Sequence, residues 1–221
     1  MNRARSSTRR TTSALAIATV LFLPATAAAQ AWTYPSFQTP QVVEREYNFG
    51  VADGGDNGTS LMFQWREGFS PVSQLSLDIG IADPEFGDAY FLLGGAYGRQ
   101  LMRANAELPL DLLFTAGAYA GLGDNSIFRI PVGLSVGHRF PLEGQLAITP
   151  YLHPRVAVDV CTECGMGGDS DAEVNAAFDL GVNFEVTRQL SLRFAAVFGE
   201  LEEDGFGFSV AWRPRGLRVT R

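Results

Sequence analysis

The amino-acid sequence predicts an all-β fold, namely a closed antiparallel up-and-down β-barrel of about ten strands, with eight strands as the alternative. Three observations support this prediction. Apolar and polar residues alternate with period two from Val43 to Trp212, as in strands whose two faces meet different surroundings. The alternating runs number ten, an even number, as in single-chain bacterial barrels. The connections between the runs alternate between two chemical kinds, which is typical of a meander with two distinct ends.

The individual strands follow from this alternation. The clearest run is 174–186, where Val, Ala, Phe and Leu fill one face and mostly Asn, Asp, Gly and Glu fill the other. A period of 3.6 would scatter the apolar residues around a helix, so this run favours a strand. The same reasoning, applied in order along the chain, predicts strands at 43–52, 58–67, 73–82, 88–102, 109–121, 127–140, 145–160, 173–186, 189–199 and 205–213.

The connections divide into two groups. Those after the odd-numbered strands are acidic and mostly rich in Gly, whereas those after the even-numbered strands lack Asp-Gly clusters. In an up-and-down meander all connections of one group lie at the same end, so we expect one acidic end. The acidic group is 53–58, 82–88, 121–126, 161–172 and 201–205, and the other group includes 68–72, 103–108, 141–144 and 187–189.

The N-terminus has the features of a secretory signal peptide over residues 1–29. It carries four Arg and no acidic residue, then an apolar run at 14–23 and a stretch of small residues up to Ala29. The apolar run is too short to cross a bilayer as a helix. We therefore expect an exported protein. The remaining divisions are an N-terminal linker at 30–42, the barrel at 43–213 and a basic C-terminal tail at 214–221.

Composition excludes several classes of protein. With 46% hydrophobic and 19% charged residues, the chain of 221 residues is too apolar to be disordered. The formal net charge is −7, and it becomes −11 once the four Arg of the signal peptide are removed. A negative charge argues against nucleic-acid binding through phosphate neutralisation. Two Cys are too few for a disulfide framework.

The two strand faces separate a membrane barrel from a soluble one. The polar face of a soluble barrel meets water and carries long charged side chains. Here that face holds mainly Gly, Ala, Ser and Asn with charges of both signs, which suits a crowded lumen. The other face is large, apolar and rich in Phe, which suits lipid. Strands in hydrocarbon must close on themselves, because every backbone polar group has to be paired internally. The aromatic residues expected at the membrane interfaces are Tyr47, Trp65, Tyr97, Phe140, Phe206 and Trp212.

With these features the chain from Val43 to Arg213 resembles a small bacterial outer-membrane β-barrel protein, at the level of the class. The resemblance implies a porin-like transmembrane barrel in the bacterial outer membrane. The implied partners are the lipid bilayer and the barrel-assembly machinery, without nucleic acid, and the implied state is a monomer. The sequence departs from the class at its C-terminus. Such proteins often finish on an aromatic residue, whereas here Trp212 is followed by a basic tail.

The charges expected in the lumen are nearly balanced. A lone buried charge is very costly, whereas a paired one is tolerable, so the balance favours a network of ion pairs that fills the barrel. About eight strands give a lumen that side chains just fill, and ten leave slightly more room, so a narrow pore for small solutes stays open. The expected network is Glu46, Arg66, Asp78, Asp111, Arg129, His153, Arg155, Asp159, Asp179, Glu185 and Arg193, with Glu44, Arg139 and Arg213 on the same face.

Evidence for catalysis in the sequence is weak. No catalytic, nucleotide-binding or zinc-protease motif is present. His138 is expected on the outer face near the interface, and His153 in the lumen, where Ser135 on the neighbouring strand is a conceivable partner. An ordinary polar lumen side chain explains His153 better than a catalytic one. We therefore expect no catalytic residues, no metal and no cofactor.

Cys161 and Cys164 form the most specific local feature. In an oxidising compartment this pair predicts a disulfide that staples the loop. A zinc site needs about four ligands and neither His is close in sequence, although a metal site with Asp169 and Asp171 is an alternative. The sequence 57–59 matches a glycosylation sequon, for which a turn is sufficient explanation.

The predicted function is therefore an outer-membrane β-barrel protein with a polar, mostly salt-bridged lumen and a structural or small-solute permeation role. Two alternatives remain. One is an outer-membrane barrel enzyme that acts on lipid or peptide. The other is a soluble exported β-barrel that binds an apolar ligand.

Overall fold

The structure of the chain is a computed structural model that describes residues 36–54, 58–84, 88–123, 126–162, 171–199 and 205–214. The predicted signal peptide at 1–29 lies outside the described residues, as does all of the C-terminal tail except Pro214. The strands are β1 (Arg45–Asp53), β2 (Thr59–Ser70), β3 (Ser73–Asp83), β4 (Tyr90–Met102), β5 (Asp111–Leu122), β6 (Ser126–Gly137), β7 (Phe140–Pro141), β8 (Ala147–Thr162), β9 (Asp171–Glu185), β10 (Leu190–Gly199) and β11 (Gly205–Trp212).

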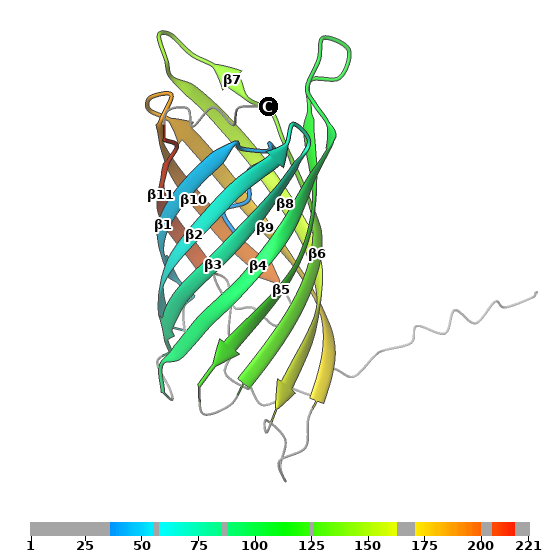
Figure 1. Cartoon of the computed structure of the whole chain (residues 1–221), viewed down its shortest axis with the longest axis vertical. Helices are drawn as coiled ribbons and strands as arrows, with labels where there is room; N and C mark the ends of the chain where they lie inside the picture. The colour runs from blue at the N-terminus through cyan, green and yellow to red at the C-terminus, as the bar shows by residue number, and fades with distance from the viewer. Residues whose placement is uncertain are drawn as a thin grey trace, which may run out of the picture.

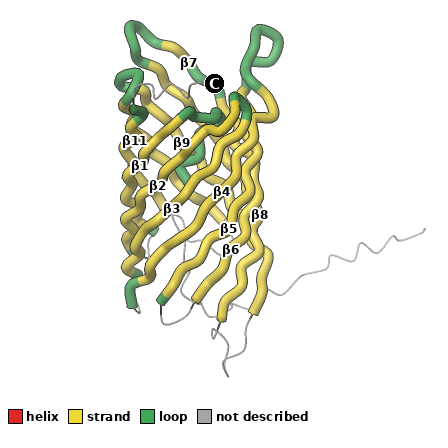
Figure 2. The backbone as a smooth tube through the Cα atoms, viewed as in Figure 1, coloured by secondary structure: helices red, strands yellow, loops and turns green. Residues whose placement is uncertain are grey.

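Ten long strands close into one antiparallel barrel (Figures 1 and 2). The strands β1 to β6 are paired in sequence order. β6 then pairs with β8, and the strands β8 to β11 are again paired in sequence order. The pairing of β1 with β11 closes the barrel, with Tyr47 opposite Trp212 and Asp53 opposite Phe206. The prediction of a closed up-and-down barrel of about ten strands is thus confirmed, and the alternative of eight is wrong.

One predicted strand is shorter than expected. The run 127–140 is a single strand in the prediction, but β6 ends at Gly137 and the two-residue β7 follows it. The reason lies on the neighbouring strand, because the next pairing would join His138 to Pro150. Proline has no backbone N–H to donate to a ladder, and the amide of His138 is 3.4 Å from the Pro150 carbonyl. The chain therefore leaves the barrel wall after Gly137.

The two ends of the barrel differ, as the meander requires. The turn end carries the connections after β2, β4, β6 and β9, together with β7 and the last described residues (Figure 1). The acidic end carries the connections after β1, β3, β5, β8 and β10. Near the turn end, Tyr47 is paired across the strands with Trp65 on one side and Trp212 on the other, and the rings of Tyr47 and Trp212 stack with centroids 5.7 Å apart. Phe206 lies at the other end, opposite Asp53.

The outer wall of the barrel is apolar. Large hydrophobic side chains point away from the lumen on every long strand, and Val174 and Phe206 are 75% and 63% exposed. No helix in the described part of the chain is long and apolar enough to cross a membrane. The exposed set on β9 and its neighbours illustrates the pattern, with Leu152, Val156, Val158, Val174, Phe178, Leu180, Phe184 and Phe194.

Two tyrosines fill the lumen against glycines of the wall. Tyr119 lies against Gly94, its partner across β4 and β5, because a Cβ atom on Gly94 would come 1.9 Å from the tyrosine ring. Tyr151 covers Gly181 in the same way across β8 and β9, with a Cβ contact of 2.2 Å. Only glycine leaves room for these rings, so Gly94 and Gly181 are packing requirements of the lumen.

Candidate functional site

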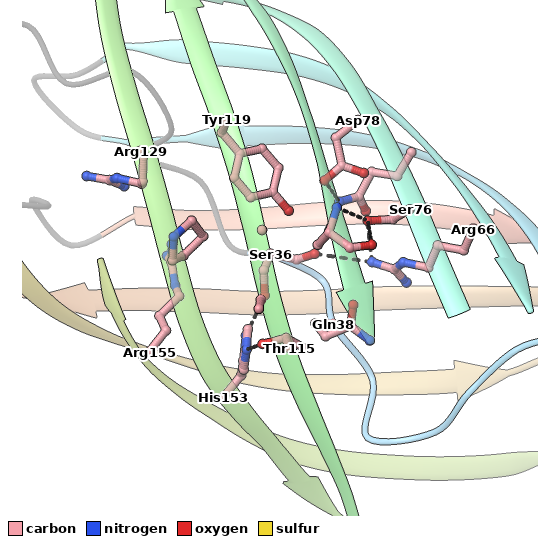
Figure 3. Close-up of a pocket in the computed structure, with 15 residues that line it drawn as sticks. Ser36, Gln38, Arg66, Ser76, Asp78, Thr115, Tyr119, Arg129, His153 and Arg155 are labelled. Atoms are coloured by element: carbon pink, nitrogen blue, oxygen red, sulfur yellow. Dashed lines mark hydrogen bonds between the residues drawn. The ribbon is translucent and has the colours of Figure 1, made fainter. Parts of the chain in front are cut away.

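The segment before β1 occupies the lumen. Residues 36–43, which we call the strap, run inside the barrel from the middle of the lumen to the turn end, where β1 begins (Figures 1 and 3). Phe37 is fully buried, and Gln38 and Thr39 are nearly so. The strap is separate from the sheet, because the pairing of β1 with β2 begins only at Arg45. From Ser36 onward, the predicted linker at 30–42 thus lies within the barrel.

Phe37 anchors the strap in a space that two glycines leave open. A Cβ atom on Gly207 of β11 would lie 2.7 Å from the ring of Phe37, and one on Gly50 of β1 would lie 3.2 Å from it. The backbone of Phe37 has a φ of 49°, in the left-handed region. This conformation costs a non-glycine residue about 1–2 kcal/mol. Burial of the whole ring stabilises the strap by a similar or larger amount, so packing of Phe37 offsets its backbone strain.

Polar side chains from five strands of the wall bind the backbone of the strap, and one of them is Asp179 of β9, whose Oδ2 accepts from the Ser36 amide at 3.2 Å. These groups hold the strap as an extended peptide, largely independent of its side chains. Arg66 Nη2 donates to the Ser36 and Phe37 carbonyls (3.3 and 3.1 Å), Gln64 Nε2 to Ser36 (3.2 Å), Ser135 Oγ to Gln38 (2.7 Å) and Gln100 Nε2 to Pro40 (2.8 Å), while Gln100 Oε1 and Gln74 Oε1 accept from the amides of Val42 (3.0 Å) and Val43 (2.9 Å).

Ser36 completes a group of hydrogen-bonding side chains around His153 (Figure 3). The Ser36 hydroxyl donates to Asp179 Oδ2 at 2.5 Å and lies 2.8 Å from His153 Nδ1. On the other side of the ring, His153 Nε2 is 2.9 Å from Oγ1 of Thr115. His153 Nδ1 is 3.1 Å from Asp179, which also pairs with Arg155 at 3.3 Å. Hydroxyl, imidazole and carboxylate therefore lie in the order of a nucleophile–base–acid triad, with Thr115 in the position of the nucleophile.

The space beside this group is small. Ser36, Thr115, Tyr119 and His153 are among the residues that line a cavity of about 50 Å³ (Figure 3). One water occupies at least about 10–15 Å³ on this measure. The cavity therefore has room for a few waters and none for a lipid or a peptide.

Glu46 is the centre of the largest buried group of charges. Its Oε1 accepts from Arg66 at 3.0 Å, and its Oε2 pairs with Arg193 at 2.6 Å and with Arg213 at 2.9 Å. Glu46 and Arg193 have no exposed surface, and Arg66 has almost none. Three guanidinium groups around one carboxylate would be left without compensation if that carboxylate were removed.

The other predicted lumen charges make further contacts on the inward face. Most of the eleven predicted residues are buried on the inward face, and Arg155, Asp159 and Glu185 are half-buried. Gln64 connects Asp78 to the Glu46 group, because Gln64 Oε1 accepts from Arg66 at 3.2 Å, and the other charges form local ion pairs and amide contacts. The contacts are Arg129 with Asp159 (2.7 and 2.9 Å), Arg139 with Glu185 (2.9 and 2.7 Å), Gln64 to Asp78 (3.3 Å) and Gln41 to Asp111 (2.6 Å).

Of the remaining candidates, one contacts the strap and the others lie elsewhere. Ser135 donates to the carbonyl of Gln38, so it belongs to the strap contacts. His138 follows β6 and packs edge-on against Phe140, with ring centroids 4.4 Å apart. Cys161 is disulfide-bonded at the end of β8, whereas Cys164, Asp169 and Asn57 lie outside the described residues. Asp171 begins β9, and no cluster of three or more metal-binding side chains occurs among the residues described.

The strap and its binding groups are the part of the site that sequence reasoning missed. Residues 36–43 have no periodicity, and the amides that hold them resemble ordinary lumen side chains in the sequence. The only available signal was the coincidence of an aromatic residue, Phe37, in the linker with glycines on the inward face of the strands.

Comparisons with known proteins identify no family. No family model and no curated protein matches the chain. Solved structures that match include a designed transmembrane β-barrel (13% identity, TM-score 0.35, 78% of this chain and 97% of that one). Another is the KdgM porin in complex with disordered oligogalacturonate (8%, 0.39, 78% and 100%). A third is a chain from a study of in-meso crystallisation of membrane proteins (13%, 0.35, 77% and 83%). At these values they carry no weight for the function of this chain.

Proposed function

We propose that the chain is an outer-membrane β-barrel protein with a closed lumen and a structural role in the envelope. The observation that carries the proposal is the distribution of side chains on the wall. Apolar side chains are exposed on its outside, and charged side chains are buried on its inside. In water this arrangement would expose a large apolar surface, of a kind that marks a membrane or protein interaction site. A closed barrel is also the only sheet that leaves no unpaired edge in hydrocarbon.

The height of the apolar wall supports this proposal. Ten residues separate Val174 from Phe184 on β9, both exposed and apolar. At about 3.3 Å per residue and a tilt of about 40°, they span about 25 Å along the barrel axis. Apolar bands of transmembrane barrels are about 25 Å tall. Tyr47, Trp65 and Trp212 near the turn end suit one interface, where amphipathic rings are favoured.

The same distribution of side chains argues against a soluble barrel that binds an apolar ligand. Such a barrel needs an apolar interior, whereas here the lumen contains Glu46, Arg66, Asp179 and Arg193, all almost fully buried. Permeation of solutes through the barrel as it stands is also disfavoured, because the strap occupies the centre and the cavity beside it there measures only about 50 Å³.

A barrel enzyme is the second candidate, because Thr115, His153 and Asp179 have a triad-like order. Two features disfavour it. The hydroxyl of Ser36 lies within hydrogen-bond distance of the same ring nitrogen that faces Asp179, and the cavity of about 50 Å³ is too small for a lipid or peptide substrate. Thr115→Ala and His153→Ala variants test this candidate, since both should abolish any lipase, esterase or peptidase activity found in the purified barrel. Loss of such activity in both variants would favour the enzyme over the structural protein.

Fractionation of cells that express the full chain tests the proposed function. We expect the mature protein in the membrane fraction after washing with high salt and with alkali, and extraction only by detergent. We also expect its migration on a gel to depend on heating, because a closed barrel resists unfolding by detergent at room temperature. Recovery in the periplasmic fraction without detergent would overturn the proposal.

A further inference from the structure

We infer that the strap is a removable plug, that the lumen is a binding groove for an extended peptide, and that an aqueous pore lies beneath the strap. This inference rests on the proposed function, since a pore has meaning only for a barrel in a membrane. The occupant of the groove is a segment of the chain itself, residues 36–43.

The barrel is wide enough to hold an extended chain inside its wall. At about 4.8 Å between strands and a tilt of about 40°, ten strands give a backbone radius of about 10 Å and eight give about 8 Å. Side chains alone fill an eight-stranded lumen. The two additional strands add about 110 Å² of cross-section, of which an extended chain takes about 5 Å by 10 Å, or about 50 Å². The strap therefore fills space that the wall side chains do not need to fill.

The empty space along the lumen narrows at the strap. At the turn end a cavity of about 900 Å³ opens between Glu44, Arg188 and Arg213, and the strap residues Gln41, Val42 and Val43 also line it. Beside the inner end of the strap, at Ser36 and Gln38, the cavity measures only about 50 Å³. The strap is thus the element that closes a wide mouth. Its removal would leave a channel of about 50 Å² in section, or about 4 Å in radius, from the estimate above.

The strap is attached to the barrel without strand pairing. It takes no part in the β-ladder, so its release breaks no strand pairing. Its backbone is held by side chains, and most of these are neutral amides or hydroxyls, which contribute about 0.5–1.5 kcal/mol each. Phe37 adds backbone strain that release would relieve. Glu46 forms its ion pairs with Arg66 and Arg193 of the wall and with Arg213, none of which belongs to the strap, so these pairs would stay intact.

Single-channel recording in planar bilayers tests the inference. The mature protein should give baseline current, and a variant that begins at Val42 should give discrete current steps. A synthetic peptide with the sequence of residues 36–43, added to the shortened barrel, should abolish these steps. The same peptide with Phe37→Ser should block much less, because it lacks the ring that fits beside Gly50 and Gly207.

A second variant keeps the strap and changes only a wall residue against which Phe37 packs. Gly207→Leu places a side chain where the ring of Phe37 lies, so it should produce current steps in the mature protein. Phe37→Ala in the same chain should restore closure. Phe206→Leu is the matched control, because Phe206 is the neighbouring residue on the outer face and is 63% exposed. This control should stay at baseline.

The outcomes separate the inference from the proposed function. If the shortened barrel enters the bilayer with heat-dependent migration but passes no more current than the mature protein, the plug is overturned while the membrane barrel stands. Equal current steps from the mature protein and from Gly207→Leu would also overturn the plug. A mature chain that never enters membranes would overturn the proposed function itself.

Discussion

The two faces of the barrel wall are made by the same strands and yet obey opposite rules. On β9, Phe178 and Leu180 point outward and are 43% and 56% exposed, while Asp179 between them is fully buried. The outward residues make their contacts with whatever surrounds the barrel. Asp179 instead contacts Ser36, His153 and Arg155 within it. The inward face of this fold thus carries the specific polar contacts, and the outward face determines which medium surrounds the barrel.

The stability of the inner face depends on the pairing of its charges, whereas the stability of the outer face depends on the medium around the barrel. A buried charge without its partner costs several kcal/mol whatever surrounds the protein. An exposed apolar residue costs little in lipid and much more in water. Changes on the two faces should therefore differ both in size and in their dependence on the environment.

The largest effect is expected at Glu46. Glu46→Ala leaves Arg66, Arg193 and Arg213 without their shared carboxylate, so we expect a loss of about 3–5 kcal/mol in the free energy of unfolding. Denaturant titration of the barrel in detergent micelles measures it. Glu67→Ala is the control, because Glu67 forms a partly exposed ion pair with Arg45 on the outer side, where about 0–1 kcal/mol is typical. Equal losses in the two variants would remove the distinction between the faces.

A charge on the outer face should have the next largest effect, and only in lipid. Leu180→Arg near the middle of the wall should destabilise the barrel in vesicles by about 2–4 kcal/mol. Leu142→Arg is the control, because Leu142 is similarly exposed, at 54%, but lies in a connection at the turn end. Unfolding titrations in vesicles compare the two. A Leu180→Arg barrel as stable as the control would show that this face does not meet hydrocarbon.

The glycine under Tyr151 should give a smaller effect. In Gly181→Ala the new methyl group would lie 2.2 Å from the tyrosine ring, so we expect overpacking to destabilise the barrel by about 1–3 kcal/mol. The double variant Gly181→Ala with Tyr151→Leu should recover part of this loss, because the ring is removed. Denaturant titration of both variants checks the contact, and an unchanged Gly181→Ala barrel would contradict it.

The smallest effect concerns the two ends of the barrel. The five predicted acidic connections contain twelve acidic residues and no basic residue. The shortened barrel that begins at Val42 should therefore prefer cations modestly, as measured by the reversal potential in a KCl gradient. At about 1 M salt the screening length falls to about 3 Å and the preference should vanish. An anion preference at low salt would contradict the role of the acidic end.

The sequence was sufficient for the wall and insufficient for the strap. The alternation at 174–186 predicts which side chains of β9 face inward, because register in a strand is fixed by its period of two. The end of β6 depends on Pro150 in the neighbouring strand, which local alternation cannot show. The position of Phe37 depends on Gly50 and Gly207, which are distant from it in sequence. Contacts that arise only on closure of the barrel are therefore the ones that periodicity misses.

The central claim, that the outer face meets lipid and the inner face does not, can be tested on β9. Spin labels at positions 178, 179 and 180, in a chain whose native Cys are replaced by Ser, report their access to oxygen and to a water-soluble nickel complex in vesicles. We predict high oxygen access and low nickel access at 178 and 180, and low oxygen access at 179. High nickel access at 178 and 180 would contradict the account.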